Sequence, residues 1–144
     1  MSNSKQRKLE EERVAAVTTV ASQRRIKNIL LIEDDDDTRY VLQSILSDGG
    51  YSVRAAVNRD EAEQHLSRAL YQVILMDFFM PGKTADDFIR LVLQTSPGCI
   101  IVLITAAQNA AKAAGSLGLK HYLGKPLDSN VLLALLERFE RNTD

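Results

Sequence analysis

The sequence contains few of the residues on which disulfides, transition-metal sites and membrane spans depend. Cys99 is the only cysteine among 144 residues, so no intramolecular disulfide can form. It opens an apolar run, where we expect it to be buried and unreactive. His65 and His121 are the only histidines, and neither has a partner at metal-ligand spacing. No apolar run approaches the length of a membrane span, and residues 14–21 are too weakly apolar for a signal core. We therefore expect a cytoplasmic protein with no membrane span.

Aromatic residues are scarce as well. Tryptophan is absent and only four phenylalanines and four tyrosines occur, so the core must consist mainly of Leu, Ile, Val and Ala. The length of 144 residues favours one domain, and 45% apolar with 26% charged residues is typical of a globular protein. Residues 1–28 carry seven basic and three acidic side chains, a net charge of +4, which leaves −5 on the rest of a chain whose total is −1. An acidic main domain argues against nucleic acid as a direct partner.

What the sequence does contain is a set of apolar runs that end in polar residues. Residues 73–76 (Val-Ile-Leu-Met) lead directly into Asp77, and the turn signal Pro81-Gly82 follows. This pattern predicts a strand that is buried on both faces, as in a parallel sheet, with Asp77 at its carboxyl end. A carboxylate in that position is costly to bury unless other groups compensate its charge.

Four other runs also predict strands. They cover residues 28–32, 51–57, 99–104 and 121–124. The first leads into the acidic pair Glu33-Asp34, the third into Thr105, and the last into Lys125, which Pro126 follows. Because the carboxyl ends of parallel strands share one edge of a sheet, we expect these side chains to meet Asp77 at that edge.

Helical periodicity fills the gaps between the predicted strands. Helices are expected at residues 38–46, 58–70, 84–95, 107–117 and 128–139. Asp36 or Asp37 is expected to cap the first helix, and Leu93 to face the core from the third. The helix at 107–117 is rich in alanine and should be short and lightly packed. Five alternations of strand and helix predict an α/β fold with a doubly wound parallel sheet and helices on both faces.

The three carboxylates predict a particular chemistry. Glu33, Asp34 and Asp77 at one edge would repel one another and raise one another's pKa values. A divalent cation relieves this repulsion, and Mg²⁺ takes carboxylates, carbonyls and waters as ligands. Such a site suits phosphoryl transfer, in which a metal and fixed positive groups neutralise oxygens around an in-line nucleophile. A carboxylate can be that nucleophile and form an aspartyl phosphate.

In this order, the strand-end residues Glu33-Asp34, Asp77, Thr105 and Lys125 resemble the receiver domain of bacterial two-component response regulators. The resemblance covers residues 27–142 and leaves residues 1–26 as an N-terminal extension that is partly disordered or helical. Residues 1–8 are polar, and we expect them to be disordered. The resemblance implies a five-stranded, flavodoxin-like sheet of order 2-1-3-4-5, which periodicity alone does not give. Taken singly, each residue could be a cap or a surface side chain. Their joint occurrence, in order, favours the receiver interpretation.

The resemblance implies a role for each acidic residue. Asp77 is the expected phosphoacceptor. Asp34 is expected to bind Mg²⁺ directly and Glu33 mainly through water. The backbone carbonyl of Phe79 would complete the protein ligands of the metal.

Three other residues are expected to respond to the phosphoryl group. Thr105 and Lys125 would contact it, and Tyr122 matches the aromatic that turns inward on activation. A sensor histidine kinase or phosphotransfer protein would be the donor and an unknown protein the downstream target, so we expect a signalling domain rather than an enzyme. We expect no DNA-binding or catalytic domain after residue 144, and therefore expect output through protein–protein binding or onward phosphotransfer.

Some positions depart from the family pattern. Ala85 stands where the family usually has glycine, so the loop that follows Asp77 is expected to take a different path. The spacings from Asp77 to the next two strand-end residues, 28 and then 20, run short and point to a shortened fourth helix. Phe79 and Ala107 offer no polar side chain to position a water, which predicts slow self-dephosphorylation.

Two other classes stay open. A phosphatase of the haloacid dehalogenase type also uses a strand-end aspartate and Mg²⁺, but it needs a second aspartate where Phe79 stands; turnover of phosphomonoesters would identify it. A receiver fold that only binds partners would show unchanged spectra with Mg²⁺ and beryllofluoride, a phosphoryl mimic. A homodimer formed through a helix at residues 9–25 is a further alternative, against a frayed helix there.

Overall fold

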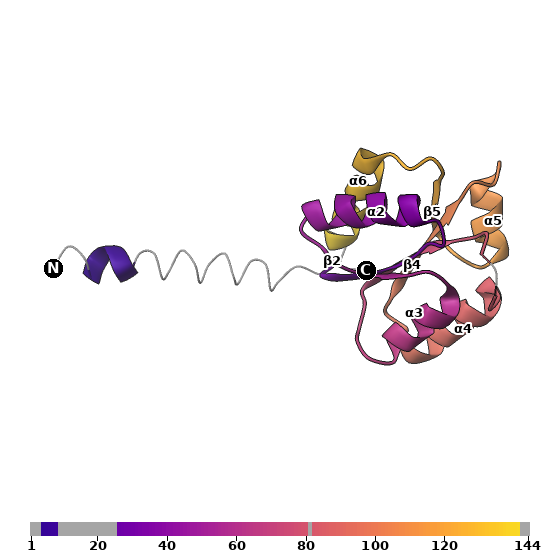
Figure 1. The fold of residues 1–144 in the computed structure, drawn as a ribbon, viewed down its shortest axis with the longest axis horizontal. Coiled ribbons are helices and arrows are strands. Elements are labelled where there is room, and N and C mark those ends of the chain that lie inside the picture. Colours follow the sequence, from indigo (N-terminus) through magenta and orange to yellow (C-terminus); the bar gives the residue numbers. More distant parts are fainter. Residues whose placement is uncertain (1–3, 9–25, 81, 142–144) are drawn as a thin grey trace.

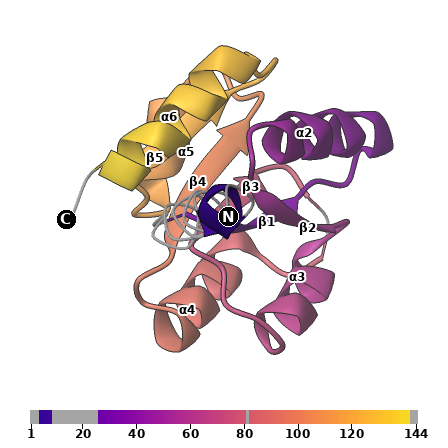
Figure 2. The ribbon, with the colours of Figure 1, turned by 90° about the vertical axis from the view of Figure 1, so that its left-hand side faces the viewer.

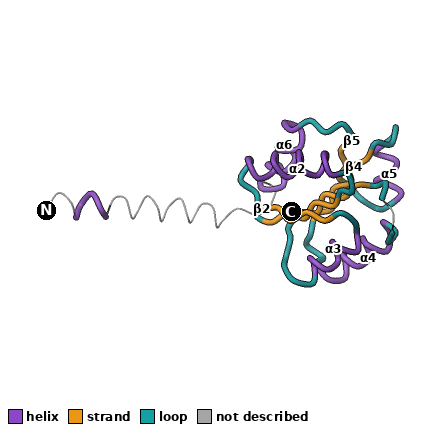
Figure 3. Tube along the Cα trace, viewed as in Figure 1, coloured by secondary structure: helices purple, strands orange, loops and turns teal. Residues whose placement is uncertain are grey.

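Strands and helices alternate along the computed structural model, which describes residues 4–8, 26–80 and 82–141 (Figures 1 and 3). The strands are β1 (Asn28–Ile32), β2 (Ser52–Ala56), β3 (Val73–Asp77), β4 (Ile100–Thr105) and β5 (His121–Gly124). The helices between and after them are α2 (Asp36–Asp48), α3 (Arg59–Leu66), α4 (Ala85–Thr95), α5 (Ala110–Ser116) and α6 (Ser129–Arg141).

The strands form one parallel sheet in the order β2-β1-β3-β4-β5, which confirms the predicted topology. Within it Asp77 pairs in register with Ile104, and Thr105 pairs with Gly124. Because all five strands run the same way, their carboxyl ends lie at one edge. This register therefore brings the polar residues that follow the apolar runs to the same side of the molecule.

Helices cover both faces of the sheet (Figures 1 and 2). Helices α2 and α6 pack on one face, and α3, α4 and α5 pack on the other. All five residues of β3 are buried. Leu75 packs in the core between the sheet and helices α2 and α6, whereas Ile74 and Met76 pack in the core between the sheet and helices α3, α4 and α5. Burial on both faces explains why this strand is an uninterrupted apolar run rather than an alternating one.

The N-cap of α2 was predicted at Asp36 or Asp37, and this prediction was wrong. Asp35 is the N-cap, and its Oδ2 accepts a hydrogen bond from the Thr38 amide at 2.8 Å. Asp36 and Asp37 instead occupy the first turn, where their charge suits the helix dipole. An N-cap side chain bonds the amide two or three residues ahead, and in this acidic run Asp35 is placed to reach that of Thr38.

Two leucines predicted to be helical or inward lie outside the core. Helix α3 ends at Leu66, so Leu70 falls in the following loop and is 74% exposed. On α4, Leu93 is 56% exposed, while Ile89 is buried. The buried stripe of α4 runs through Phe88, Ile89 and Val92. Leu93 is the next residue after Val92, and the turn of the helix over that one residue carries its side chain to the edge of the stripe.

Two predictions about short segments also need correction. Helix α5 starts at Ala110 rather than at 107, because Asn109 is its N-cap and accepts from the Lys112 amide at 3.0 Å. Residues 4–8 form a short helix, whereas disorder was expected there. The helix predicted for residues 9–25 lies outside the described residues.

The single cysteine is partly buried, whereas full burial was expected. Cys99 immediately precedes β4, and burial raises the pKa of its thiol to about 12, which makes it a poor nucleophile. In the part of the chain that the structure describes, no helix is both long and apolar enough to cross a membrane.

Candidate functional site

Backbone hydrogen bonds fix each strand-end residue at the carboxyl edge of the sheet. The Glu33 amide donates to the Ala56 carbonyl at 3.0 Å, which extends the β1–β2 ladder by one residue. Asp77 and Thr105 are the last residues of β3 and β4. The Lys125 amide donates to the Thr105 carbonyl at 2.8 Å. The side chains therefore start from backbone positions that the sheet itself holds.

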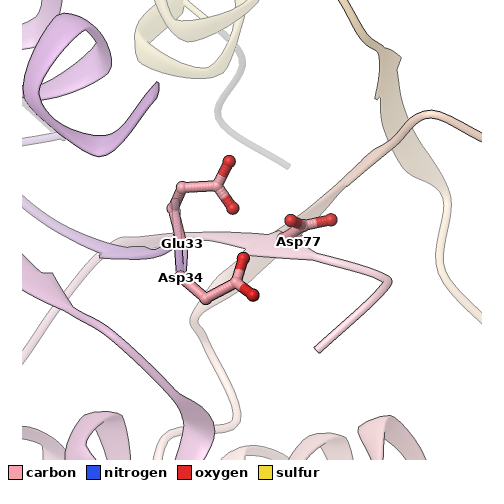
Figure 4. A group of neighbouring side chains, drawn as sticks. All are labelled: Glu33, Asp34 and Asp77. Atoms are coloured by element: carbon pink, nitrogen blue, oxygen red, sulfur yellow. The ribbon is translucent and has the colours of Figure 1, made fainter. Parts of the chain in front are cut away.

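Three carboxylates gather where β1 and β3 end (Figure 4). Oxygens of Glu33, Asp34 and Asp77 lie within 4.8 Å of one another. Glu33 is 1% exposed and Asp77 5%, whereas Asp34 is open to solvent. Burial, and then the hydrogen bond with Asp77, raise the pKa of Glu33 from its ordinary value near 4.5 to about 7. Oε2 of Glu33 is buried without a hydrogen-bond partner among the described residues. The cluster thus offers oxygen ligands for a cation, and a bound cation would offset the repulsion between its carboxylates. It is therefore a candidate cation site.

Lys125 supplies positive charge to this cluster. Its Nζ lies 2.7 Å from Glu33 Oε1 and 2.9 Å from Asp77 Oδ2. Burial by itself would lower the pKa of Lys125, but the bonds to Glu33 and Asp77 outweigh that and raise it. The other oxygen of Asp77, Oδ1, accepts the Phe79 amide at 3.2 Å. Asp77 is therefore held from two sides, by an amine and by a backbone N–H.

The remaining predicted residues lie around this centre at different depths. Thr105 is fully buried, one residue beyond the register partner of Asp77, and its Oγ1 accepts the Ala107 amide at 3.0 Å. Tyr122 is 43% exposed and Phe79 57% exposed. The threonine hydroxyl is thus an internal group, while the two aromatics stand at the surface.

Two arginines that sequence reasoning did not single out also belong to the site. Arg59, the first residue of α3, is only 2% exposed, and its guanidinium donates to carbonyls of the loop that follows Asp77. Arg39 donates to the Glu33 carbonyl at 3.0 Å. An arginine in the first turns of a polar helix is usually solvated, so its position alone gave no signal of burial.

The family comparison agrees with this geometry. The model of the family described as "Response regulator receiver domain" matches residues 29–137, which include every strand-end residue of the site. The chain belongs to this family. The match confirms the resemblance drawn from the sequence, and it identifies residues 29–137 as a receiver domain of two-component response regulators, a signalling domain.

Curated relatives of this receiver domain are longer proteins. The transcriptional regulatory protein DltR of Streptococcus agalactiae is 30% identical over 95 residues, which are 65% of this chain and 42% of DltR. The DNA-binding transcriptional regulator NtrC of Escherichia coli is 30% identical over 102 residues, 69% of this chain and 22% of NtrC. The chain therefore spans less than half the length of either relative.

Solved receiver structures share the fold. The chemotaxis response regulator CheY4 of Vibrio cholerae is 26% identical with a TM-score of 0.71, over 78% of this chain and 98% of that one. The response regulator TrrA of Thermotoga maritima, solved in complex with Mg²⁺ and BeF, is 23% identical with a TM-score of 0.69 over the same shares. A two-component response regulator from Clostridium difficile, 24% identical, reaches a TM-score of 0.73 over 82% of this chain and 98% of its own.

Proposed function

We propose that this receiver domain accepts a phosphoryl group on Asp77, from a phosphohistidine of a sensor histidine kinase or phosphotransfer protein, and thereby switches a protein-binding surface. The observation that carries the proposal is the position of Asp77: a buried strand-end carboxylate held by Lys125 Nζ at 2.9 Å and by the Phe79 amide at 3.2 Å. A nucleophile needs this kind of fixed position beside positive charge.

The residues present fit a divalent cation, and we propose Mg²⁺. Oxygens are the ligands this hard cation prefers, and Glu33, Asp34 and Asp77 offer three within 4.8 Å of one another. The buried, unpartnered Oε2 of Glu33 supports this assignment, because a cation bound directly or through water would satisfy it. With the backbone carbonyl of Phe79, these residues would hold the ion. When bound, Mg²⁺ neutralises charge on the phosphoryl oxygens.

The chain's own residues would perform the transfer. A carboxylate oxygen of Asp77 attacks phosphorus, an O–P bond forms, and the P–N bond to the donor imidazole breaks with its electron pair on nitrogen, which takes up a proton. Lys125 already binds Asp77 Oδ2 and would pair with a phosphoryl oxygen after transfer. The hydroxyl of Thr105 would donate to another phosphoryl oxygen, since accepting the Ala107 amide leaves its proton free to donate.

The switch would follow from this redistribution of contacts. Movement of Thr105 toward the phosphoryl group vacates space beside β5, which the half-exposed ring of Tyr122 can fill. The domain would have two arrangements, one before and one after the movement of Thr105 and Tyr122. The phosphoryl group shifts the population between them only by the difference in its interaction free energy with each. The surface around α5, β5 and α6 would be the one that changes. The apolar Phe79 and Ala107 lead us to expect slow self-dephosphorylation, measurable as slow loss of label from the purified phosphoprotein.

An open groove beside the site supports a protein as phosphoryl donor. It has a volume of about 570 Å³, lies next to Lys125, and is lined by apolar residues of α2 and of the segment after β5, including Val41, Ile45 and Leu127. Val41 is 53% exposed and Tyr40, its neighbour on α2, 73%. An apolar surface adjoining the acceptor suits a partner that must dock before transfer.

Intact mass after incubation with acetyl phosphate, with and without Mg²⁺, tests the proposal. The wild type should gain one phosphoryl group only with Mg²⁺, and Asp77→Asn should gain none. Asp36→Asn, which removes an exposed carboxylate of the same acidic edge, is the matched control and should behave as wild type. An adduct that persists in Asp77→Asn would reject Asp77 as the acceptor.

If the wild type gains no adduct, beryllofluoride binding decides the outcome. Spectral changes with Mg²⁺ and beryllofluoride would mean that the site is competent but accepts only from its protein donor. Unchanged spectra would reject phosphoryl acceptance and favour a receiver fold that only binds partners. Turnover of phosphomonoesters would instead support the phosphatase alternative.

A further inference from the structure

Arg59 is a buried cation whose guanidinium is directed at the end of β3 and the loop that follows it. It is the first residue of α3 and only 2% exposed. Its Nη1 donates to the Lys83 carbonyl at 2.8 Å, and its Nη2 donates to the carbonyls of Phe78 at 3.0 Å and Asp77 at 3.2 Å. All three acceptors belong to residues 77–83, so the guanidinium crosses from one helix to the β3–α4 loop.

Other residues of α3 hold the same loop. The Lys83 side chain forms an ion pair with Glu63 of α3, in addition to the bond between its carbonyl and Arg59. Gly82 lies beside α3, since a Cβ atom at this position would be 3.5 Å from Asp60 Oδ2. Contacts from α3 therefore reach both Phe78 and Lys83, which lie at the two ends of this segment.

The bond to the Phe78 carbonyl has a direct consequence for Asp77. The Phe78 carbonyl and the Phe79 amide belong to one planar trans peptide and point in opposite directions. A guanidinium that draws the carbonyl toward α3 therefore turns the Phe79 N–H the other way, and this N–H donates to Asp77 Oδ1 at 3.2 Å. Arg59 thus determines the orientation of a peptide that contacts the acceptor carboxylate.

We propose that Arg59 is a positioning residue of the phosphoacceptor site: by holding the carbonyls of Asp77, Phe78 and Lys83, it orients the peptide that binds Asp77 and the loop edge on which the cation and the phosphoryl group are held. This inference rests on the proposed function. It adds to it a residue of this chain that touches neither the cation nor the phosphoryl group and acts through the loop.

The charge of Arg59 and its geometry predict opposite effects on cation binding. A fixed positive charge behind Asp77 repels a second cation, so its removal would strengthen binding if charge were the main effect. The three hydrogen bonds hold the loop in place, so their removal weakens binding if position is the main effect. Lysine keeps the charge but cannot reproduce a planar fork that binds three carbonyls. The two substitutions therefore separate the two roles.

The test is Mn²⁺ binding, followed by electron paramagnetic resonance of the free ion, to wild type, Arg59→Met and Arg59→Lys. Both variants should bind Mn²⁺ about tenfold more weakly than wild type, in the range typical of lost support for metal ligands. Arg54→Met, which removes an exposed arginine of β2, is the matched control and should bind as wild type. If Arg59→Lys binds Mn²⁺ as tightly as wild type and Arg59→Met binds it more tightly, Arg59 affects cation binding only through its charge. That result would overturn the proposal.

A measurement without metal separates this inference from the proposed function. Exchange of the Phe79 amide hydrogen in the metal-free protein should be about tenfold faster in both Arg59 variants, because the peptide is no longer held toward Asp77. An unchanged rate would overturn the inference, even if stability falls. If the wild type binds no Mn²⁺ at millimolar concentration, the proposed cation site fails, and the exchange rate alone decides the role of Arg59. If Arg59→Met does not fold, Mn²⁺ binding and exchange of the Phe79 amide are both measured on Arg59→Lys.

Discussion

Two regions of this receiver domain are built differently. The acceptor region, which we define as β1, β3, α3 and α4 with their loops, is densely packed: β3 is buried throughout, and α4 buries Phe88, Ile89 and Val92. The readout region, α5 and β5, is thin by comparison. Helix α5 has seven residues and buries only Ala114, and β5 alternates half-buried with exposed residues. The two regions meet at Thr105 and Lys125, and they have different structural requirements.

The difference follows from what each region would have to do. A nucleophilic carboxylate and its cation site need fixed geometry, which well-packed strands and the bonds of Arg59 provide. A surface that switches needs two arrangements close in free energy, which a short helix with few buried contacts allows. Dense packing around Asp77 and sparse packing around Tyr122 would therefore be complementary features of the proposed mechanism.

The largest expected contrast is in core packing. Phe88→Ala should lower the free energy of unfolding by about 3–5 kcal/mol, because it removes a fully buried ring. Ala114→Gly, which alters the one buried residue of α5, should cost about 1–2 kcal/mol through helix propensity and one methyl group. Urea unfolding at 25 °C measures both values. Equal losses would mean that the two regions are packed alike.

Glu33 should give the acceptor region a pH dependence of its own. Its pKa is raised to about 7, so between pH 4.5 and 7 the folded state keeps a proton that the unfolded state releases. The free energy of unfolding should therefore fall as pH rises through this window, by roughly 3 kcal/mol from this group. Urea unfolding in EDTA measures the fall, and Glu33→Gln should remove it.

The difference between wild type and Glu33→Gln is the informative quantity. Burial lowers the pKa of His121, so this histidine contributes a slope of opposite sign, and it is present in both proteins. Added Mg²⁺ should reduce the fall in the wild type, because a cation takes the place of the proton. A wild type that gains stability relative to Glu33→Gln as pH rises from 4.5 to 7 would contradict the assignment.

The smallest expected effect is the response of the readout region. On adding Mg²⁺ and beryllofluoride, amide hydrogen exchange should change by roughly fivefold in residues 110–124, about 1 kcal/mol, which is typical of coupling between sites. Helix α4 beyond its first turn should change less, because Phe88, Ile89 and Val92 anchor it in the core. Asp77→Asn supplies the control without a response. If amide hydrogen exchange changes by the same factor over the whole domain, the acceptor and readout regions do not respond differently.

Local sequence signals predicted most of the elements but missed features that depend on contacts across the fold. The strands at 28–32, 73–77 and 121–124 could be recognised because apolar runs end abruptly at polar residues. The burial of Arg59 could not, because its three acceptors lie 18 to 24 residues along the chain. The position of Leu93 was missed because a helix with apolar residues on several faces has no unique inward stripe without its partner.

The sequence by itself determined the family, the sheet and the order in which carboxylates, hydroxyl and amine reach the strand ends, because parallel strands bring equivalent ends to one edge. The tertiary structure decided how these groups meet. Lys125 binds Glu33 from 92 residues away and Asp77 from 48, and burial raises the pKa of Glu33. These depend on distances and on exclusion of water, which exist only once the chain has folded.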